Sequence, residues 1–292
     1  MDWARDGRHW PHHQQSRFVS SGGRRWHVQL WLGPSVQAPQ LLLLHGTGAS
    51  THSWRSLVPL LARQAGVVAL DLPGHGFSDP ARGDGATLPG MARDVTALLR
   101  QIGLRPTVLM GHSAGAAIAV RMALDHPQGL KAVISLNGAL LPLHGVAGRV
   151  FSPLAKLLAT NRLAPQLFAW RAAQPSRVRR LVEGTGSSID VAGIELYSRL
   201  VRDPAHVAGA LAMMANWDLR DLVAALPTLR TPMHLLAADR DKAVPMSQSQ
   251  RAARLLPQAT FVRLPALGHL AHEEDPQQVY EKIAPLLDGR AG

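Results

Sequence analysis

The sequence predicts an α/β protein with a mostly parallel, eight-stranded sheet, helices on both of its faces and a helical cap. Six short apolar runs alternate with helical patterns, as in doubly wound sheets whose strands are buried on both faces. Two further runs near the start flank a Gly-Gly turn, which is typical of an antiparallel hairpin. The alternation stops between Asn137 and Leu226, where helix-like segments interrupted by prolines replace it.

The expected strands are short and rich in apolar residues. The hairpin strands, at 18–20 and 26–32, flank Ser21-Gly22-Gly23. The six buried strands are expected at 41–44, 67–70, 107–110, 132–136, 233–237 and 260–264. Apolar spacing predicts helices at 53–64, 88–102, 114–126, 246–256 and 276–287.

Length allows one large α/β domain or two ordinary ones, since the chain has 292 residues. No Ser/Gly/Pro-rich linker separates two cores, and no repeat period appears. We therefore predict one α/β core, residues 1–136 and 229–292, with a helical cap at residues 137–228 inserted into it. An insertion of this size between two sheet strands predicts a cover over the functional site.

Composition excludes several kinds of chemistry. The chain has no cysteine, so it has no disulfide framework, thiolate nucleophile or Cys-ligated metal. It shows no Walker loop and no dinucleotide fingerprint, and we expect neither a cofactor nor a metal. No signal peptide is evident, and no apolar stretch reaches the roughly 18 residues that a membrane span needs. We expect a cytoplasmic protein, with peripheral membrane contact as an alternative.

The charge is strongly positive, with 31 Lys and Arg against 20 Asp and Glu. No basic run interleaved with aromatic residues appears, so we expect no nucleic-acid partner. The excess is local, because no acidic residue lies between Asp125 and Glu183. This basic segment has three interpretations: a solvated cap surface, a face for anionic lipid, or a site for a carboxylated apolar substrate.

A serine lies at an abrupt junction between a predicted strand and a predicted helix, within Gly111-His112-Ser113-Ala114-Gly115. A side chain on so sharp a turn has strained backbone dihedrals, and the flanking glycines allow neighbouring backbone to approach. The turn presents Ser113 at the positive end of the following helix. This pattern, in this strand–turn–helix context, predicts a catalytic nucleophile.

Serine needs a general base and a group that orients that base. The strand at 233–237 is followed by Asp239-Arg240-Asp241, which supplies two candidate acids. His269 follows the last strand, and each candidate lies where open α/β sheets place their sites. We predict a triad of Ser113, Asp241 and His269, with Asp239 as the competing acid.

A tetrahedral intermediate needs preorganised hydrogen-bond donors for its developing negative charge. The strand at 41–44 ends in His45-Gly46-Thr47-Gly48, a glycine-rich loop. The backbone N–H groups of Thr47 and Ala114 are the predicted oxyanion donors. His45 and Gly46 are also candidates for substrate contact, although a histidine here more often orients the loop.

These motifs resemble the α/β-hydrolase superfamily. Its acidic residue stands three residues before Val-Pro, which selects Asp241 in Asp241-Lys242-Ala243-Val244-Pro245. The resemblance implies hydrolysis by a serine triad, because dehalogenases and epoxide hydrolases of this superfamily carry Asp at the elbow. Further matching segments are Asp71-Leu72-Pro73-Gly74-His75-Gly76-Phe77-Ser78 and Gly268-His269.

A narrower likeness is to magnesium-chelatase accessory proteins encoded with bacteriochlorophyll-biosynthesis genes. It is carried by Asp2-Trp3 to Trp10-Pro11, Ser16-Arg17-Phe18-Val19, Arg25-Trp26-His27-Val28-Gln29 and His45-Gly46-Thr47-Gly48-Ala49. The first hypothesis is a hydrolase of an ester-like or activated carbonyl substrate, such as a porphyrin ester. The alternative is a non-catalytic porphyrin-binding accessory that makes transient contact with magnesium chelatase. In either case the cap residues Trp170, Met213, Met214 and Trp217 are candidates for an apolar slot.

Overall fold

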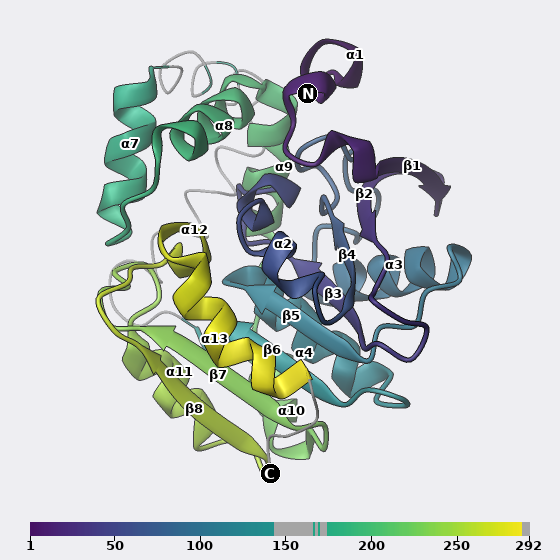
Figure 1. The fold of residues 1–292 in the computed structure, drawn as a ribbon, viewed down its shortest axis with the longest axis vertical. Coiled ribbons are helices and arrows are strands. Elements are labelled where there is room, and N and C mark those ends of the chain that lie inside the picture. The colour runs from purple at the N-terminus through teal and green to yellow at the C-terminus, as the bar shows by residue number, and fades with distance from the viewer. Residues whose placement is uncertain (143–165, 167–168, 170–173, 288–292) are drawn as a thin grey trace.

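The computed structural model describes residues 1–142, 166, 169 and 174–287, and Figure 1 shows its arrangement. One eight-stranded sheet has the strand order β1-β2-β4-β3-β5-β6-β7-β8. Its strands are β1 (Ser16–Ser21), β2 (Arg24–Trp31), β3 (Gln40–Leu44), β4 (Gly66–Leu70), β5 (Val108–His112), β6 (Ala132–Leu136), β7 (Met233–Ala238) and β8 (Ala259–Leu264). The pairs β1–β2 and β2–β4 are antiparallel and all other pairs are parallel. The predicted sheet is confirmed.

Helices lie on both faces of this sheet and at one end of the molecule (Figure 1). They are α1 (Trp3–Asp6), α2 (Val58–Leu61), α3 (Leu88–Gln101), α4 (Ala114–Asp125), α7 (Pro175–Gly184), α8 (Val191–Arg202), α9 (Pro204–Ala215), α10 (Arg220–Ala225), α11 (Met246–Ala253), α12 (Ala271–Glu274) and α13 (Pro276–Leu287). The described residues also form short 3-10 helices: η1 (Gly7–His9), η2 (His13–Gln15), η3 (Thr51–Trp54) and η4 (Leu226–Thr228).

The core is divided by the sheet into two apolar layers. Residues of α3, α4, α10 and α11 form one layer with side chains such as Leu42 and Leu109. Residues of η3, α2 and α13 form the other layer with side chains such as Leu41 and Met110. Neighbouring residues of one strand therefore contribute to opposite layers, which explains why the parallel strands are apolar at most positions and do not alternate between apolar and polar residues.

The helix predicted over residues 53–64 is wrong in extent. The structure divides this segment into η3 and the four-residue α2, with Pro59 in the first turn of α2. Proline has no backbone N–H, so it is tolerated at a helix start and disfavoured in a helix interior. The 3-10 helix η3 therefore ends at Trp54, and the separate helix α2 begins at Val58.

The described part of residues 137–228 consists of helices and their connections. α7, α8 and α9 lie together at one end of the molecule, whereas α10 lies beside α4 near the opposite end (Figure 1). A third apolar cluster joins α7 and α8 to the N-terminal segment through residues that include Trp10, Phe77, Val178, Ile194 and Leu200. The N-terminal segment thus forms part of the surface on which α7 and α8 rest.

Candidate active site

Ser113 lies between the last residue of β5 and the first residue of α4, in a strained conformation with φ 52° and ψ −120°. The flanking glycines make this turn sterically feasible. A Cβ on Gly111 would lie 2.2 Å from the carbonyl group of Gly115, and a Cβ on Gly115 would lie 2.2 Å from the carbonyl oxygen of Leu44. Strain of this kind persists only where the surroundings enforce it, and it presents the Ser113 side chain at the strand end.

The predicted base and acid are in direct contact. His269 Nδ1 lies 2.8 Å from Asp241 Oδ2, and both residues are buried. The other carboxylate oxygen, Oδ1, accepts hydrogen bonds of 2.8 Å from the backbone N–H groups of Ala243 and Val244. These three contacts fix the orientation of Asp241, which leaves His269 Nε2 as the nitrogen available for proton transfer.

The competing acid is engaged elsewhere. Asp239 accepts hydrogen bonds from Arg263 of β8 at 2.6 Å and from the Ala266 N–H at 2.8 Å. The structure therefore brings Asp241, and not Asp239, to His269. His272, three residues beyond the base, is fully buried against Trp54, with no hydrogen bond from either ring nitrogen among the described residues.

The nucleophile loop is joined to the base loop through the residue that precedes Ser113. His112 Nε2 donates a hydrogen bond of 2.8 Å to the backbone carbonyl oxygen of His269. Among the described residues, Ser113 Oγ and His269 Nε2 make no hydrogen bond with each other. Such bonds are often long in a free enzyme and shorten only when substrate binds.

Asn137, which sequence reasoning missed, connects the loop of His269 to the end of β7, which precedes Asp241. Its side-chain Nδ2 donates to the carbonyl oxygens of Gly268 at 3.1 Å and His269 at 2.8 Å, and its Oδ1 accepts from the Ala238 N–H. Two residues close to it, Leu136 and Ala139, bond the backbone N–H and carbonyl of Ser113. The signal in the sequence was a polar residue directly after β6, at the same sheet edge as the triad.

The glycine-rich loop after β3 lies against the nucleophile. A Cβ on Gly46 would be 3.0 Å from Ser113 Cβ, so glycine is the residue that best allows this approach. Neither the Thr47 N–H nor the Ala114 N–H donates a hydrogen bond to another described residue. Two unused donors beside the nucleophile are the arrangement that an oxyanion requires.

His45 orients that loop. Its Nε2 accepts a hydrogen bond from the Leu72 N–H at 2.9 Å, and its Nδ1 donates to the Gly46 carbonyl oxygen at 2.8 Å. Burial lowers the pKa of His45, which favours the neutral ring that these two bonds require. With both nitrogens bound to backbone and no exposed surface, the ring has no polar atom left for a substrate.

The four candidate residues of the cap have different positions. Met213 is fully buried, and its Sδ accepts a hydrogen bond from Thr47 Oγ1 at 3.4 Å. Met214 and Trp217 are partly buried, and Trp217 packs against the core layer that contains α4. Trp170 lies outside the described residues.

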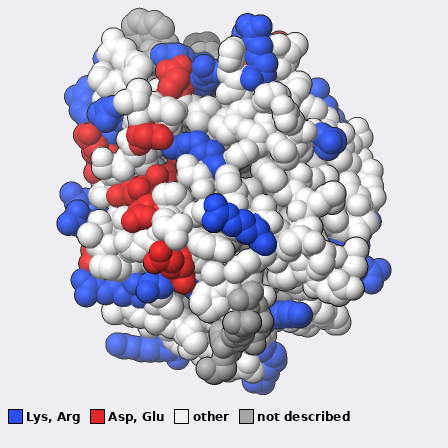
Figure 2. Space-filling model, in the orientation of Figure 1, with Lys and Arg blue, Asp and Glu red and all other residues white. Residues whose placement is uncertain are grey.

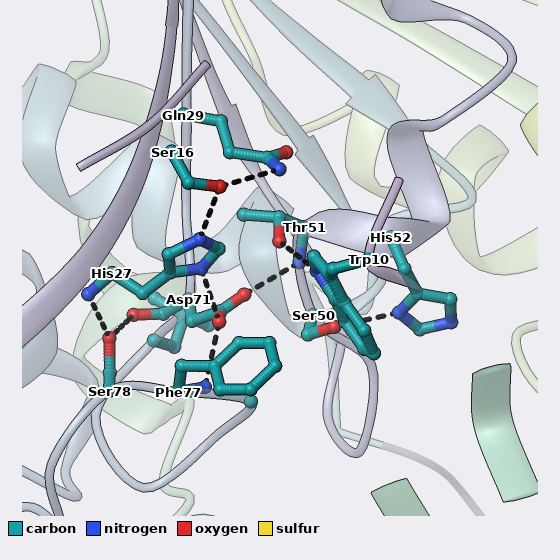
Figure 3. Close-up of polar contacts among 12 residues, drawn as sticks. Trp10, Ser16, His27, Gln29, Ser50, Thr51, His52, Asp71, Phe77 and Ser78 are labelled. Atoms are coloured by element: carbon teal, nitrogen blue, oxygen red, sulfur yellow. Dashed lines mark hydrogen bonds and ion pairs between the residues drawn. The ribbon is translucent and has the colours of Figure 1, made fainter. Parts of the chain in front are cut away.

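A second polar cluster surrounds Asp71 in the loop after β4 (Figure 3). His27 Nδ1 contacts Asp71 Oδ2 at 2.8 Å, and the N–H groups of Thr51 and Phe77 donate to the same carboxylate. Burial alone raises the pKa of Asp71, but His27 and these hydrogen bonds outweigh it and hold the pKa below its usual value. The ionised carboxylate joins the β1–β2 hairpin, η3 and the 71–78 loop, which is a structural role.

Residues 1–142 and 174–287 contain no group of three His, Asp or Glu side chains arranged to hold a metal ion. In the same ranges, no helix combines the length and apolar character that crossing a membrane requires.

Comparison with known proteins identifies the family. Residues 39–276 match the model of the alpha/beta hydrolase fold family. The chain belongs to this family. The match includes the turn at Ser113, the glycine-rich loop after β3 and the loops that carry Asp241 and His269. It confirms the resemblance that the motifs indicated.

Three relatives of this α/β hydrolase are informative. A protein named magnesium-chelatase 30 kDa subunit, from Rhodobacter capsulatus, is 40% identical over 96% of this chain and 97% of its own length. An sn-1-specific diacylglycerol lipase of Mus musculus is 26% identical over 85% of this chain and 81% of its own. A solved esterase from Thermogutta terrifontis has a TM-score of 0.71 at 24% identity, covering 95% of this chain and all of its own. The first of these confirms the narrower likeness, and the esterase structure supports the hydrolase fold alone.

Proposed function

We propose that this α/β hydrolase cleaves an ester-like or otherwise activated carbonyl substrate with Ser113, His269 and Asp241. The observation that carries the proposal is the 2.8 Å contact between His269 Nδ1 and Asp241 Oδ2. It orients a histidine whose backbone carbonyl is hydrogen-bonded to His112, the residue before the strained serine. A binding protein has no use for a serine at an enforced turn together with an oriented histidine–carboxylate pair.

The reaction follows from the roles of these groups. Ser113 Oγ attacks the carbonyl carbon while its proton passes to His269 Nε2, and the N–H groups of Thr47 and Ala114 bind the resulting oxyanion. The bond to the leaving group then breaks, as His269 returns the proton to that group. Water, deprotonated by His269, attacks the acyl-enzyme and releases the acid and free Ser113. Asp241 keeps the proton on Nδ1 and stabilises the imidazolium.

We propose that the natural substrate belongs to magnesium-porphyrin biosynthesis and is a porphyrin or its ester. The support is the 40% identity to a protein named as a magnesium-chelatase subunit. A tetrapyrrole is flat and apolar, with carboxylates at one edge, so its site needs an apolar slot and a positive rim. In the described part of residues 137–228, Met214 and Trp217 are partly buried apolar side chains and α7 carries exposed arginines, and Arg suits carboxylates through its forked guanidinium.

The test uses short p-nitrophenyl esters and a fluorophosphonate on the wild-type protein and on Ser113→Ala. We expect ester turnover and covalent labelling in the wild type, and neither in the variant. Labelling mapped by mass spectrometry to Ser113 supports the mechanism. Undiminished turnover in Ser113→Ala, or a label on another residue, contradicts it.

The second candidate is a non-catalytic porphyrin-binding accessory of magnesium chelatase, and the same 40% identity favours it. Saturable quenching of tryptophan fluorescence by protoporphyrin, without ester turnover, is the result that selects it. Arg177→Glu with Arg180→Glu tests the positive rim, since it weakens pigment binding. Absence of saturable quenching at low salt contradicts pigment binding by either candidate.

Location at an anionic membrane surface, as opposed to the cytoplasm, is a separate proposal. On the face that Figure 2 shows, basic side chains are dispersed and acidic side chains form a column along one side. Exposed charges are screened beyond about 8 Å at physiological ionic strength. Because the basic side chains of this face are dispersed, it should bind anionic vesicles weakly. Because the charges are exposed, added salt should abolish that binding.

A further inference from the structure

One face of α9 contacts two loops, the glycine-rich oxyanion loop after β3 and the 71–78 loop after β4. The three residues that make this contact are His206, Gly209 and Met213, spaced three and four residues apart, as one helix face requires. A Cβ on Gly209 would lie 2.0 Å from the Gly74 carbonyl oxygen, so the helix and the 71–78 loop are in backbone contact. Met213 Sδ accepts a hydrogen bond from Thr47 Oγ1.

His206 joins two loops at once. Its Nδ1 accepts a hydrogen bond from the Gly76 N–H at 3.0 Å, and its Nε2 donates to the Gly48 carbonyl oxygen at 3.1 Å. An amide N–H only donates and a carbonyl only accepts, so these partners require a neutral ring with its proton on Nε2. Burial lowers the pKa of His206 to about 4, which keeps the ring neutral near pH 7.

The oxyanion loop is thereby held on both sides of Thr47. The Gly46 carbonyl shares its rigid peptide plane with the Thr47 N–H, so the bond from His45 to that carbonyl also sets the direction of the donor. On the other side, Gly48 has a left-handed φ of +75°, and a Cβ added there would meet nothing within 4 Å. The Gly48 carbonyl oxygen accepts a hydrogen bond from His206, and the Ala49 N–H of the same peptide donates to the Gly46 carbonyl oxygen at 3.1 Å, so both bonds restrain this open glycine.

We propose that His206 is a positioning residue that orders the oxyanion loop from the cap. It lies 158 residues from Gly48 in the sequence, and without it the Gly48 carbonyl oxygen loses its hydrogen-bond donor. The cap helix and the oxyanion donor are then ordered together, so a displaced α9 leaves Thr47 poorly oriented. The catalytic part of this inference rests on the proposed function, whereas the loop ordering does not.

The experiment compares His206→Leu, His206→Gln and Val207→Ala in the full-length protein. Leucine removes both hydrogen bonds, glutamine carries one acceptor and one donor, and Val207 is a buried neighbour on the same helix that bonds neither loop. Hydrogen exchange of residues 46–49 is the first readout. We expect faster exchange at residues 46–49 in His206→Leu and an exchange rate like that of the wild type in Val207→Ala. The exchange rate of His206→Gln should lie between those of His206→Leu and the wild type.

Catalysis is the second readout, with a p-nitrophenyl ester as substrate and a trifluoromethyl ketone as transition-state analogue. Misplacing one oxyanion donor lowers kcat by about 10- to 100-fold, somewhat less than its removal does. We expect His206→Leu to lower kcat and ketone affinity by similar factors while KM stays within about twofold, because the donor acts on the transition state.

Each result decides the inference. Unchanged exchange at residues 46–49 in His206→Leu overturns it, as does an equal kcat loss in Val207→Ala. If the leucine variant does not fold, His206→Asn replaces it, because its shorter amide keeps at most one of the two bonds. Failure of the proposed function has a different signature, since it leaves the exchange result intact and shows either no ester turnover in the wild type or turnover that does not depend on Ser113.

Discussion

The side-chain amide of Asn137 donates a hydrogen bond of 2.8 Å to the backbone carbonyl oxygen of His269, 132 residues away. Asn137 has a left-handed φ of 47°, which aims its side chain along the sheet edge toward the base loop. Because it also accepts from the Ala238 N–H, it links the strand of the acid to the loop of the base. Placement of His269 therefore depends on a residue outside the triad.

Asn137→Asp should lower kcat more than Asn137→Gly does. Aspartate keeps the acceptor for Ala238 but turns a carboxylate oxygen toward the carbonyl oxygens of Gly268 and His269. Glycine tolerates the left-handed φ and leaves those groups unpaired, at a cost of about 1–3 kcal/mol in stability. Steady-state kinetics and urea unfolding measure both effects. Equal kcat values for the wild type and Asn137→Asp would contradict the prediction that Asn137 positions His269.

Ser113→Gly should be more stable than Ser113→Ala. The φ of 52° is strained for any residue with a Cβ, and glycine relieves a strain of order 1–3 kcal/mol. Part of that gain is lost to the greater freedom of glycine in the unfolded chain. Thermal unfolding of the two variants gives the comparison, and both should lack esterase activity. A lower Tm for Ser113→Gly than for Ser113→Ala would contradict the inference that the backbone at residue 113 is strained.

Asp241→Asn should reduce turnover by about 10⁴-fold, as loss of the tautomer-fixing acid does in serine triads. Asp239→Asn should reduce it less than tenfold, because Asp239 contacts Arg263 and Ala266 and not the base. The kcat values of the two variants are measured with the same ester at the same pH and compared with that of the wild type. A larger loss in the Asp239 variant would transfer the role of acid to that residue.

Acid should destabilise the protein through its buried histidines, and His272→Phe should reduce that sensitivity. Burial lowers the pKa of His272 to about 3, so below pH 6.5 the unfolded chain takes up a proton that the folded chain refuses. Stability from this residue is complete above pH 6.5 and is lost as the pH falls toward 3. Between pH 7 and pH 5 the loss is about 2 kcal/mol.

Phenylalanine does not titrate, and it keeps a ring against Trp54 without losing a hydrogen bond that His272 makes with any described residue. Urea unfolding at pH 7 and pH 5 should show a smaller difference for His272→Phe than for the wild type. Exposed His126→Gln serves as the control and should leave the difference unchanged. An identical pH dependence in all three proteins would show that His272 is not buried as a neutral ring.

The sheet and its helices were predictable because their signals are local. An apolar run that is buried on both faces, a glycine that admits neighbouring backbone, and the order Ser, Asp, His are each visible in a few residues. Where a local signal was incomplete, the prediction failed in detail. The helix expected over 53–64 is divided, since Pro59 can begin a helix but cannot supply an interior hydrogen bond.

The choice between Asp239 and Asp241 shows where residue spacing stops being informative. Both follow β7 within three residues, and only the family pattern separated them at the level of sequence. In the structure, Arg263 from β8 binds Asp239, while the turn at Ala243 and Val244 directs Asp241 to His269. Arg263, which binds Asp239, belongs to another strand, so the spacing of residues within the loop after β7 could not predict this contact.

The order of residues along the chain was enough to predict the fold class, the strained turn at Ser113 and the contact between His269 and Asp241. The residues that hold the surrounding loops in place became visible only in three dimensions. Asn137 and His206 have no motif, and their partners His269 and Gly48 lie 132 and 158 residues away. A hydrogen bond depends on distance and direction in space, and the chain establishes both only when the sheet and the cap have come together.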